Sequence, residues 1–218
     1  DVCLQNLGVI FALDRAGLVG DDGPTHNGPF DIAYFRAIPN ITIMVPKDEN
    51  ELQHMLYTAT LLKGPVALRY PRGNGIGIRL DPEFRKLEIG KAEVMREGKD
   101  LLILGVGPII YDAINAIEEL KGHATVINAR FVKPLDNELI LKHARKFKKI
   151  ITLEEATING GFGSAVAELL EENNINSKVK RIGIPDEFIE FGKPDIQKKL
   201  AGIDKESIKK AIQEMLRK

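Results

Sequence analysis

Short apolar runs alternate with longer amphipathic stretches along the first third of the chain. Runs rich in Val and Ile are typical of strands, whereas apolar positions spaced three and four residues apart are typical of helices that pack on a sheet. The run at 7–13 is expected to be a strand buried on both faces. The pattern predicts strands at 7–13, 41–45 and 65–70, and helices at 30–36 and 48–62.

This alternation stops after residue 70 and resumes near residue 87. Pro71 and the glycines that follow it interrupt regular structure, and the charged stretch 79–86 is typical of a connection between domains. The second alternation predicts strands at 89–95, 100–104, 124–128, 149–153 and 179–182, and helices at 109–120, 137–147, 163–172, 195–200 and 205–216.

Strands separated by helices of about a dozen residues imply right-handed crossovers and parallel sheets. We therefore predict an α/β fold with two α/β domains, each with a mainly parallel sheet. The expected domains are 1–78 and 89–218, joined by a linker at 79–88. A single large α/β domain is the alternative at this length.

Charge and composition narrow the classes of partner. Lys plus Arg and Asp plus Glu both number 31, so the formal net charge is zero, which argues against nucleic acid as a partner. No apolar run is long enough to span a membrane, and the start of the sequence lacks a signal-peptide pattern. A cytoplasmic location is expected. The single cysteine, Cys3, can form no internal disulfide and is expected to be a small buried residue.

The segment that follows the first predicted strand gathers chargeable side chains among glycines. Such loops at the carboxyl ends of strands are where α/β proteins place their chemistry. Arg15, Asp22 and His26 supply a fixed cation, a carboxylate and a group that titrates near neutral pH. Arg72 follows another predicted strand, and two arginines at such positions can converge on a phosphate. A solvated loop with a capping aspartate is the alternative.

Other motifs carry weaker signals. Gly105 and Gly107 follow a strand, but Ile110 stands where a dinucleotide-binding fingerprint has its third glycine, so a tight turn is favoured. The glycines at 160–163 could bind an anion or allow a helix to pack closely. The remaining histidines, at 54, 123 and 143, lack metal-site spacing and are expected to be structural, and no metal site is predicted.

Several longer motifs extend over the whole chain. They are DRAG at 14–17, DGPTH at 22–26, DENE at 48–51, RYPRGN at 69–74, EIGKAE at 88–93, GGFGS at 160–164 and GIPD at 183–186. Together these motifs resemble one enzyme family, the 1-deoxy-D-xylulose-5-phosphate synthases of the transketolase superfamily. The resemblance includes both the loop after Arg15 and the segment that contains Arg72.

The resemblance implies a fold, an activity and roles for four residues. The chain would hold the carboxyl-terminal part of a pyrimidine-binding domain, followed by a transketolase C-terminal domain. The complete enzyme would be a homodimeric transferase that uses thiamine diphosphate and Mg²⁺ to join pyruvate, with decarboxylation, to D-glyceraldehyde 3-phosphate, in isoprenoid and thiamine biosynthesis. Arg15 and Arg72 would bind the acceptor's phosphate, Asp22 would orient the acceptor, and His26 would contact the cofactor-bound intermediate or move a proton.

The resemblance also implies that parts of the family's machinery lie outside this sequence. The glutamate and the aromatic residue that contact the cofactor's pyrimidine, and the Mg²⁺ and diphosphate ligands, are expected before Asp1. This chain alone is therefore expected to bind no cofactor and to be inactive.

Two alternatives remain. One is a half-enzyme similar to the β subunit of a 2-oxoacid dehydrogenase, which shares the pattern at 90–92. Its acceptor is lipoamide, which gives no reason for the set of Arg15, Asp22, His26 and Arg72. The other is a dimerisation module that has lost catalysis.

Overall fold

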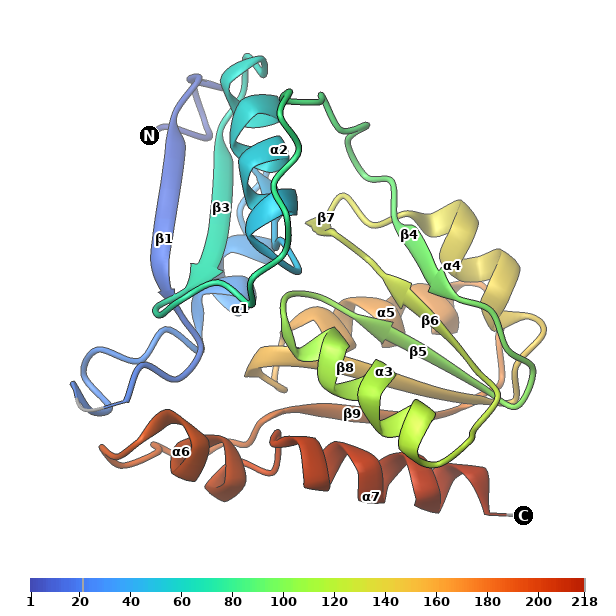
Figure 1. Ribbon diagram of the computed structural model, residues 1–218. Helices are drawn as coiled ribbons and strands as arrows, with labels where there is room; N and C mark the ends of the chain where they lie inside the picture. The colour runs from blue at the N-terminus through green and yellow to red at the C-terminus, as the bar shows by residue number, and fades with distance from the viewer. Residues whose placement is uncertain (21, 218) are drawn as a thin grey trace.

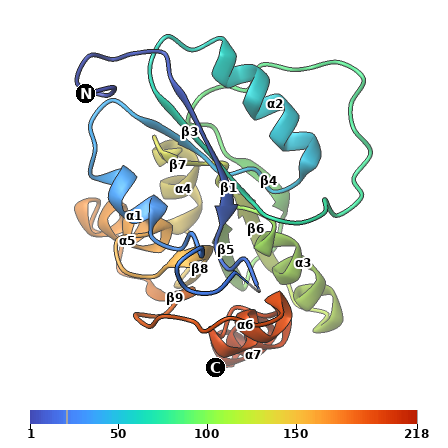
Figure 2. The same ribbon diagram turned by 90° about the vertical axis from the view of Figure 1, so that its left-hand side faces the viewer.

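Two β-sheets organise the chain in the computed structural model, which describes residues 1–20 and 22–217 (Figures 1 and 2). The first sheet has the strand order β1-β3-β2-β7, and the second has the order β4-β6-β5-β8-β9. The strands of the first sheet are β1 (Ile10–Ala16), β2 (Thr42–Met44), β3 (Val66–Pro71) and β7 (Phe131–Lys133). Those of the second are β4 (Glu93–Arg96), β5 (Leu101–Gly105), β6 (Ala124–Asn128), β8 (Lys149–Thr157) and β9 (Lys178–Ile184).

Both sheets are mainly parallel, as the sequence predicts. Only β7 pairs antiparallel with β2 in the first sheet, and only β4 pairs antiparallel with β6 in the second. The structure thus confirms the α/β class with two sheet-based units.

Seven helices cover these sheets in the described part of the chain. They are α1 (Asp31–Arg36), α2 (Glu49–Thr60), α3 (Ile109–Glu119), α4 (Asn137–Ala144), α5 (Phe162–Glu172), α6 (Pro194–Leu200) and α7 (Lys205–Leu216). Alternate residues of β5 show how the second sheet is covered, because successive side chains of a strand point to opposite faces. Leu101 and Ile103 pack in a cluster with α3 and α7, whereas Leu102 and Leu104 pack with α4, α5 and residues of the first sheet. One apolar core therefore joins the two units.

The sequence placed every helix and all strands but one. Asp48 caps α2, because its carboxylate accepts a hydrogen bond from the Glu51 amide at 2.7 Å. The missed strand is β7, whose three residues come from the second half of the sequence and pair with β2 of the first sheet. Three residues are too few to produce a period-2 signal.

The expectation that the first strand is buried on both faces is wrong. β1 begins at Ile10 and runs to Ala16, and most of its residues are half-buried or exposed. The reason is its place in the sheet: β1 pairs only with β3 among the described residues, so it is an edge strand. The longer strand also puts Arg15 within β1 and not in the loop after it.

The connection between the two sheets runs beside α2 without forming a helix or strand of its own at 72–92. Glu49 accepts hydrogen bonds from the amides of Gly77 and Ile78 at 2.6 and 2.8 Å. The Arg85 amide donates to Nδ1 of the buried His54, so Nε2 carries the proton and donates to Asp81 at 2.9 Å. Hydrogen bonds, from His54 first, lower the pKa of Asp81 to about 2. His54 is thus structural, as predicted.

A buried carboxylate joins α2 to the second sheet. Glu51 is 3% exposed and accepts from Nδ2 of Asn128 at 3.0 Å and from Nε of Arg130 at 2.7 Å. The ammonium group of Lys47 lies 3.1 Å from the same carboxylate. Because two cations and an amide satisfy this charge, it is held inside the protein at the boundary between the two units.

Candidate functional site

The structure brings together Arg15, Asp22 and Arg72, which we call the arginine cluster. β1 and β3 are parallel neighbours, and Ala16 pairs with Pro71, so both arginines lie at the carboxyl edge of the first sheet. Nη1 of Arg15 lies 2.8 Å from Oδ2 of Asp22, and Nη1 of Arg72 bonds the same oxygen. These were three of the four residues that the sequence singled out.

The arginine cluster is exposed and carries a surplus of positive charge. The side chains of Arg15, Asp22 and Arg72 are 42%, 32% and 51% exposed. Guanidinium groups stay protonated in proteins, so two cations face one carboxylate and leave a net charge of +1. A dianion such as a phosphate monoester is attracted to that surplus, and each guanidinium has further N–H donors for it.

His26 lies in the same loop but does not join the cluster. Its side chain is exposed, and Nδ1 lies 3.0 Å from Oγ1 of Thr25. Among the described residues, no hydrogen bond or ion pair links His26 to Arg15, Asp22 or Arg72. The ring is therefore available to a bound molecule, and its predicted role stays a prediction.

The loop that carries Asp22 and His26 is tied to the rest of the protein at both ends. Gly17 and Gly28 exchange backbone hydrogen bonds at 2.8 and 3.0 Å. The Gly20 amide donates to Oε1 of the fully buried Gln197 in α6 at 2.9 Å. Gly17 has φ +72°, and a Cβ there would lie 2.5 Å from Cγ of Glu155, so the turn requires glycine.

A second aspartate–arginine pair lies close by and is buried. Nε of Arg69 lies 2.8 Å from both carboxylate oxygens of Asp31, and the two residues are 3% and 6% exposed. Nη2 of Arg69 donates to the carbonyl oxygens of Glu155, at 2.7 Å, and Gly28, at 3.2 Å. This pair thus connects α1 and β3 to β8 of the second sheet.

A cavity of about 570 Å³ opens beside the arginine cluster and is lined from both units. Arg72 and Tyr70 come from the β3 end, whereas Glu155 and Lys198 come from β8 and α6. Nζ of Lys198 lies 3.3 Å from Oε2 of Glu155, so this cation already has a counter-charge. The sequence did not single out Lys198, because a lysine in a short helix resembles any surface lysine. The cavity has the volume of a small-molecule site.

The glycine-rich segment at 160–163 binds an anion that belongs to the chain itself. Oε2 and Oε1 of Glu154 accept hydrogen bonds from the amides of Phe162, at 2.6 Å, and Gly163, at 2.8 Å. Burial raises the pKa of Glu154 to about 7, although these two hydrogen bonds act to lower it. A Cβ on Gly161 would lie 2.1 Å from Oε2, which explains that glycine. The amides at the start of α5 are therefore occupied by a carboxyl group of the chain itself.

The other weak motifs have structural explanations. Gly107 has φ +80° in the turn between β5 and α3, and a Cβ there would lie 3.3 Å from Cγ1 of Val45, so the tight-turn interpretation is favoured. Cys3 is half-buried against the core that joins the two units. Within residues 1–20 and 22–217, no group of three or more His, Cys, Asp or Glu residues could hold a metal ion. No helix in the described part of the chain is long and apolar enough to cross a membrane.

Comparison with known proteins gives the same family for both units. The family model of the transketolase pyrimidine-binding domain matches residues 1–76, and that of the transketolase C-terminal domain matches residues 90–208. A solved structure described as a split-gene transketolase, an inactive β4 tetramer, superposes with a TM-score of 0.88 at 30% identity. The superposition covers 99% of this chain and 69% of the transketolase chain.

Curated relatives agree. The 1-deoxy-D-xylulose-5-phosphate synthase of Syntrophus aciditrophicus (strain SB) is 56% identical over 220 residues, which cover 99% of this chain and 34% of that protein. The 1-deoxy-D-xylulose-5-phosphate synthase 1 of Geobacter sulfurreducens (strain ATCC 51573 / DSM 12127 / PCA) is 55% identical over 221 residues, 99% of this chain and 34% of that protein. The chain spans about a third of the length of these relatives. It therefore belongs to the transketolase family, and its sequence is similar to a carboxyl-terminal portion of the 1-deoxy-D-xylulose-5-phosphate synthases.

Proposed function

We propose that this chain is the acceptor-binding part of a thiamine-diphosphate-dependent 1-deoxy-D-xylulose-5-phosphate synthase. The complete enzyme joins pyruvate, with loss of carbon dioxide, to D-glyceraldehyde 3-phosphate, in the synthesis of isoprenoid and thiamine precursors. The named relatives support the reaction, and the arginine cluster supports the part that this chain plays in it.

The observation that carries the proposal is the sharing of one Asp22 oxygen by Arg15 and Arg72. Asp22 holds the two guanidinium groups at one point of the sheet edge while leaving their charges only half neutralised. The phosphate of the acceptor binds both arginines through their remaining N–H donors. Asp22 then orients the acceptor's hydroxyl group, and His26, exposed on the same loop, moves a proton during carbon–carbon bond formation.

The cofactor is proposed for the complete enzyme and not for this chain alone. Thiamine diphosphate, bound with Mg²⁺, supplies the electron sink for the decarboxylation. The described residues offer no cluster of metal-binding side chains, so they do not fit the group by themselves and we assign no step through it. Calorimetry with this chain is expected to show no binding of thiamine diphosphate and Mg²⁺ tighter than about millimolar. Micromolar binding would contradict this assignment.

The domain boundaries and the assembly follow from the same proposal. We place the pyrimidine-binding part at 1–78, the linker at 79–88 and the C-terminal domain at 89–218, in a cytoplasmic homodimer. Light scattering that shows only monomers at tens of micromolar would count against the homodimer.

Substitution of Arg72 in the complete enzyme tests the phosphate-binding role. A charge-assisted hydrogen bond to phosphate contributes roughly 1.5–3 kcal/mol, so Arg72→Ala is expected to lower kcat/KM for D-glyceraldehyde 3-phosphate about ten- to a hundredfold. The KM for pyruvate and the use of unphosphorylated D-glyceraldehyde should change little. Equal losses for the phosphorylated and unphosphorylated acceptors would rule out a phosphate contact.

A further inference from the structure

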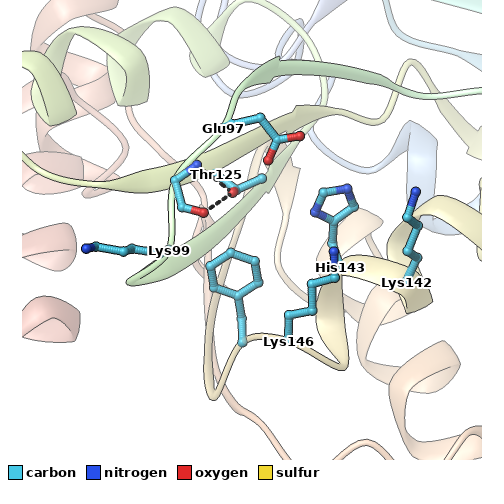
Figure 3. Close-up of a pocket in the computed structure, with 8 residues that line it drawn as sticks. Glu97, Lys99, Thr125, Lys142, His143 and Lys146 are labelled. Carbon is cyan, nitrogen blue, oxygen red and sulfur yellow. Dashed lines mark hydrogen bonds between the residues drawn. The ribbon is translucent and has the colours of Figure 1, made fainter.

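A second cavity, of about 280 Å³, lies at the edge of the second sheet where β5 and β6 begin (Figure 3). Glu97 and Lys99 precede β5, and Thr125 lies at the start of β6, so this is the amino edge of the strands. Lys142, His143, Lys146 and Phe147, from the end of α4 and the turn after it, form the opposite wall. The arginine cluster lies at the carboxyl edge of the first sheet, so this cavity is not part of the candidate site.

The His143 ring is a polar group that faces this cavity without a partner in the described part of the chain. The residue is 6% exposed, yet neither ring nitrogen has a hydrogen-bond partner within residues 1–20 and 22–217. Figure 3 shows the ring facing the space between the α4 wall and Glu97. By contrast, Thr125 is satisfied, because its hydroxyl group bonds both the amide and the carbonyl oxygen of Gly98 at 2.9 Å. The two nitrogens are not enclosed by the chain, so water or a bound molecule can supply their partners from the cavity.

The charges around His143 indicate the kind of molecule that supplies those partners. Lys142 and Lys146 project from the same end of α4, and neither forms an ion pair with another residue in the described part of the chain. Lys99 lines the cavity as well but points away from the ring in Figure 3. Glu97, also unpaired among the described residues, is the one acidic side chain on the walls. Two free ammonium groups and one carboxylate suit an anion that also has a hydrogen-bond donor.

We propose that this cavity binds a small phosphate monoester that carries a hydroxyl group. The phosphate bonds Lys142, Lys146 and an N–H of His143, and the hydroxyl group donates to Glu97. The volume exceeds that of a bare phosphate ion, and Glu97 gives a hydroxyl group of the ester an acceptor, which favours an ester of a small polyol. This inference does not rest on the function proposed for the arginine cluster.

A simpler role for these cations makes a different prediction. Basic side chains at the carboxyl end of a helix stabilise it through the helix dipole, and Lys142 and His143 occupy the last turn of α4. That role requires no ligand and gives no saturable response to a phosphate ester.

Nuclear magnetic resonance of the histidine rings tests the proposal on the 218-residue chain. The chain has four histidines, and His143→Gln identifies the signals of that ring. Titration with glycerol 3-phosphate at constant ionic strength is expected to shift the His143 signals saturably, with half-saturation in the low millimolar range. Any binding at the arginine cluster is read separately from the His26 signals.

Paired lysine variants provide the control. Lys142→Gln with Lys146→Gln should raise the half-saturation concentration roughly tenfold, because two charged contacts are lost. Lys148→Gln with Lys210→Gln removes the same charge from exposed positions outside the cavity and should leave it unchanged. A shift that does not saturate, or equal half-saturation in the two double variants, would overturn the site. Inorganic phosphate binding as tightly as glycerol 3-phosphate would overturn the assignment to an ester.

Discussion

Arg69 and Arg72 lie three residues apart at the end of the same strand, and both bond an aspartate, yet their surroundings differ in every other respect. Arg69 is buried, meets Asp31 through both carboxylate oxygens and donates to two carbonyl groups. Arg72 is half exposed and shares one oxygen of Asp22 with Arg15. In the first arrangement the charge of Arg69 is neutralised and most of its N–H donors have partners. In the second, a surplus positive charge and several N–H donors remain available.

The comparison shows how one motif can serve stability and binding at once. A buried charge must be fully paired, because removal of either partner leaves an unsatisfied ion in a medium of low dielectric. An exposed cluster tolerates unequal charges, since water solvates the surplus until a ligand replaces it. Arg69 is therefore expected to be structural and Arg72 functional, although both are arginines beside an aspartate.

Loss of Arg69 should have the largest effect on stability. Arg69→Met leaves the Asp31 carboxylate buried without its cation, so the free energy of unfolding is expected to fall by about 3–5 kcal/mol. Arg72→Met is the matched control and should change it by less than about 0.5 kcal/mol, because that side chain is exposed. Urea unfolding of the 218-residue chain measures both. Similar losses in the two variants would remove the distinction between the arginines.

Glu154 extends the comparison to a buried carboxyl group. It accepts hydrogen bonds from two backbone amides and forms no ion pair in the described part of the chain. Its pKa in the folded protein, about 7, lies above the usual value of 4.5, so the folded state binds the proton more tightly. The free energy of unfolding should therefore fall as pH rises from about 4.5 to about 7, by up to about 3 kcal/mol.

Glu154→Gln isolates that contribution, because glutamine does not titrate. Relative to the parent, the variant should gain stability between pH 5 and pH 8. Glu171→Gln, on the exposed side of α5, should run parallel to the parent over this range. The account of Glu154 fails if the difference between parent and Glu154→Gln does not change with pH.

Lys198 should show the smallest effect. It lines the same cavity as Arg72, but Glu155 already neutralises it at 3.3 Å. In the complete enzyme, Lys198→Gln is expected to lower kcat/KM for the phosphorylated acceptor only about two- to threefold. A loss as large as that of Arg72→Ala would mean that a neutralised cation contributes as much as a surplus one.

The sequence predicted most of the fold because the strands and helices of the two units are strongly patterned. Residue spacing was enough for the parallel sheets. It overestimated the burial of β1 and missed β7, because edge position and pairing between distant segments depend on tertiary contacts.

The candidate site was predicted in part. Arg15 lies near the end of β1, Asp22 in the loop after it and Arg72 directly after β3, so their convergence at one edge of the sheet could be expected. The roles of Arg69 and Lys198 could not, because each depends on a partner from a distant segment, Asp31 and Glu155. The buried His143 likewise resembled a structural histidine, since its cavity forms only when α4 meets the loop before β5.

The most direct test of the arginine cluster separates the phosphate from the rest of the acceptor. In the complete enzyme, turnover of unphosphorylated D-glyceraldehyde should rise when phosphite dianion is added, because phosphite occupies the position between Arg15 and Arg72. Arg72→Ala should lose that stimulation while it keeps the basal rate with D-glyceraldehyde. Equal stimulation of the parent and of Arg72→Ala would contradict the claim that this cluster binds the acceptor's phosphate.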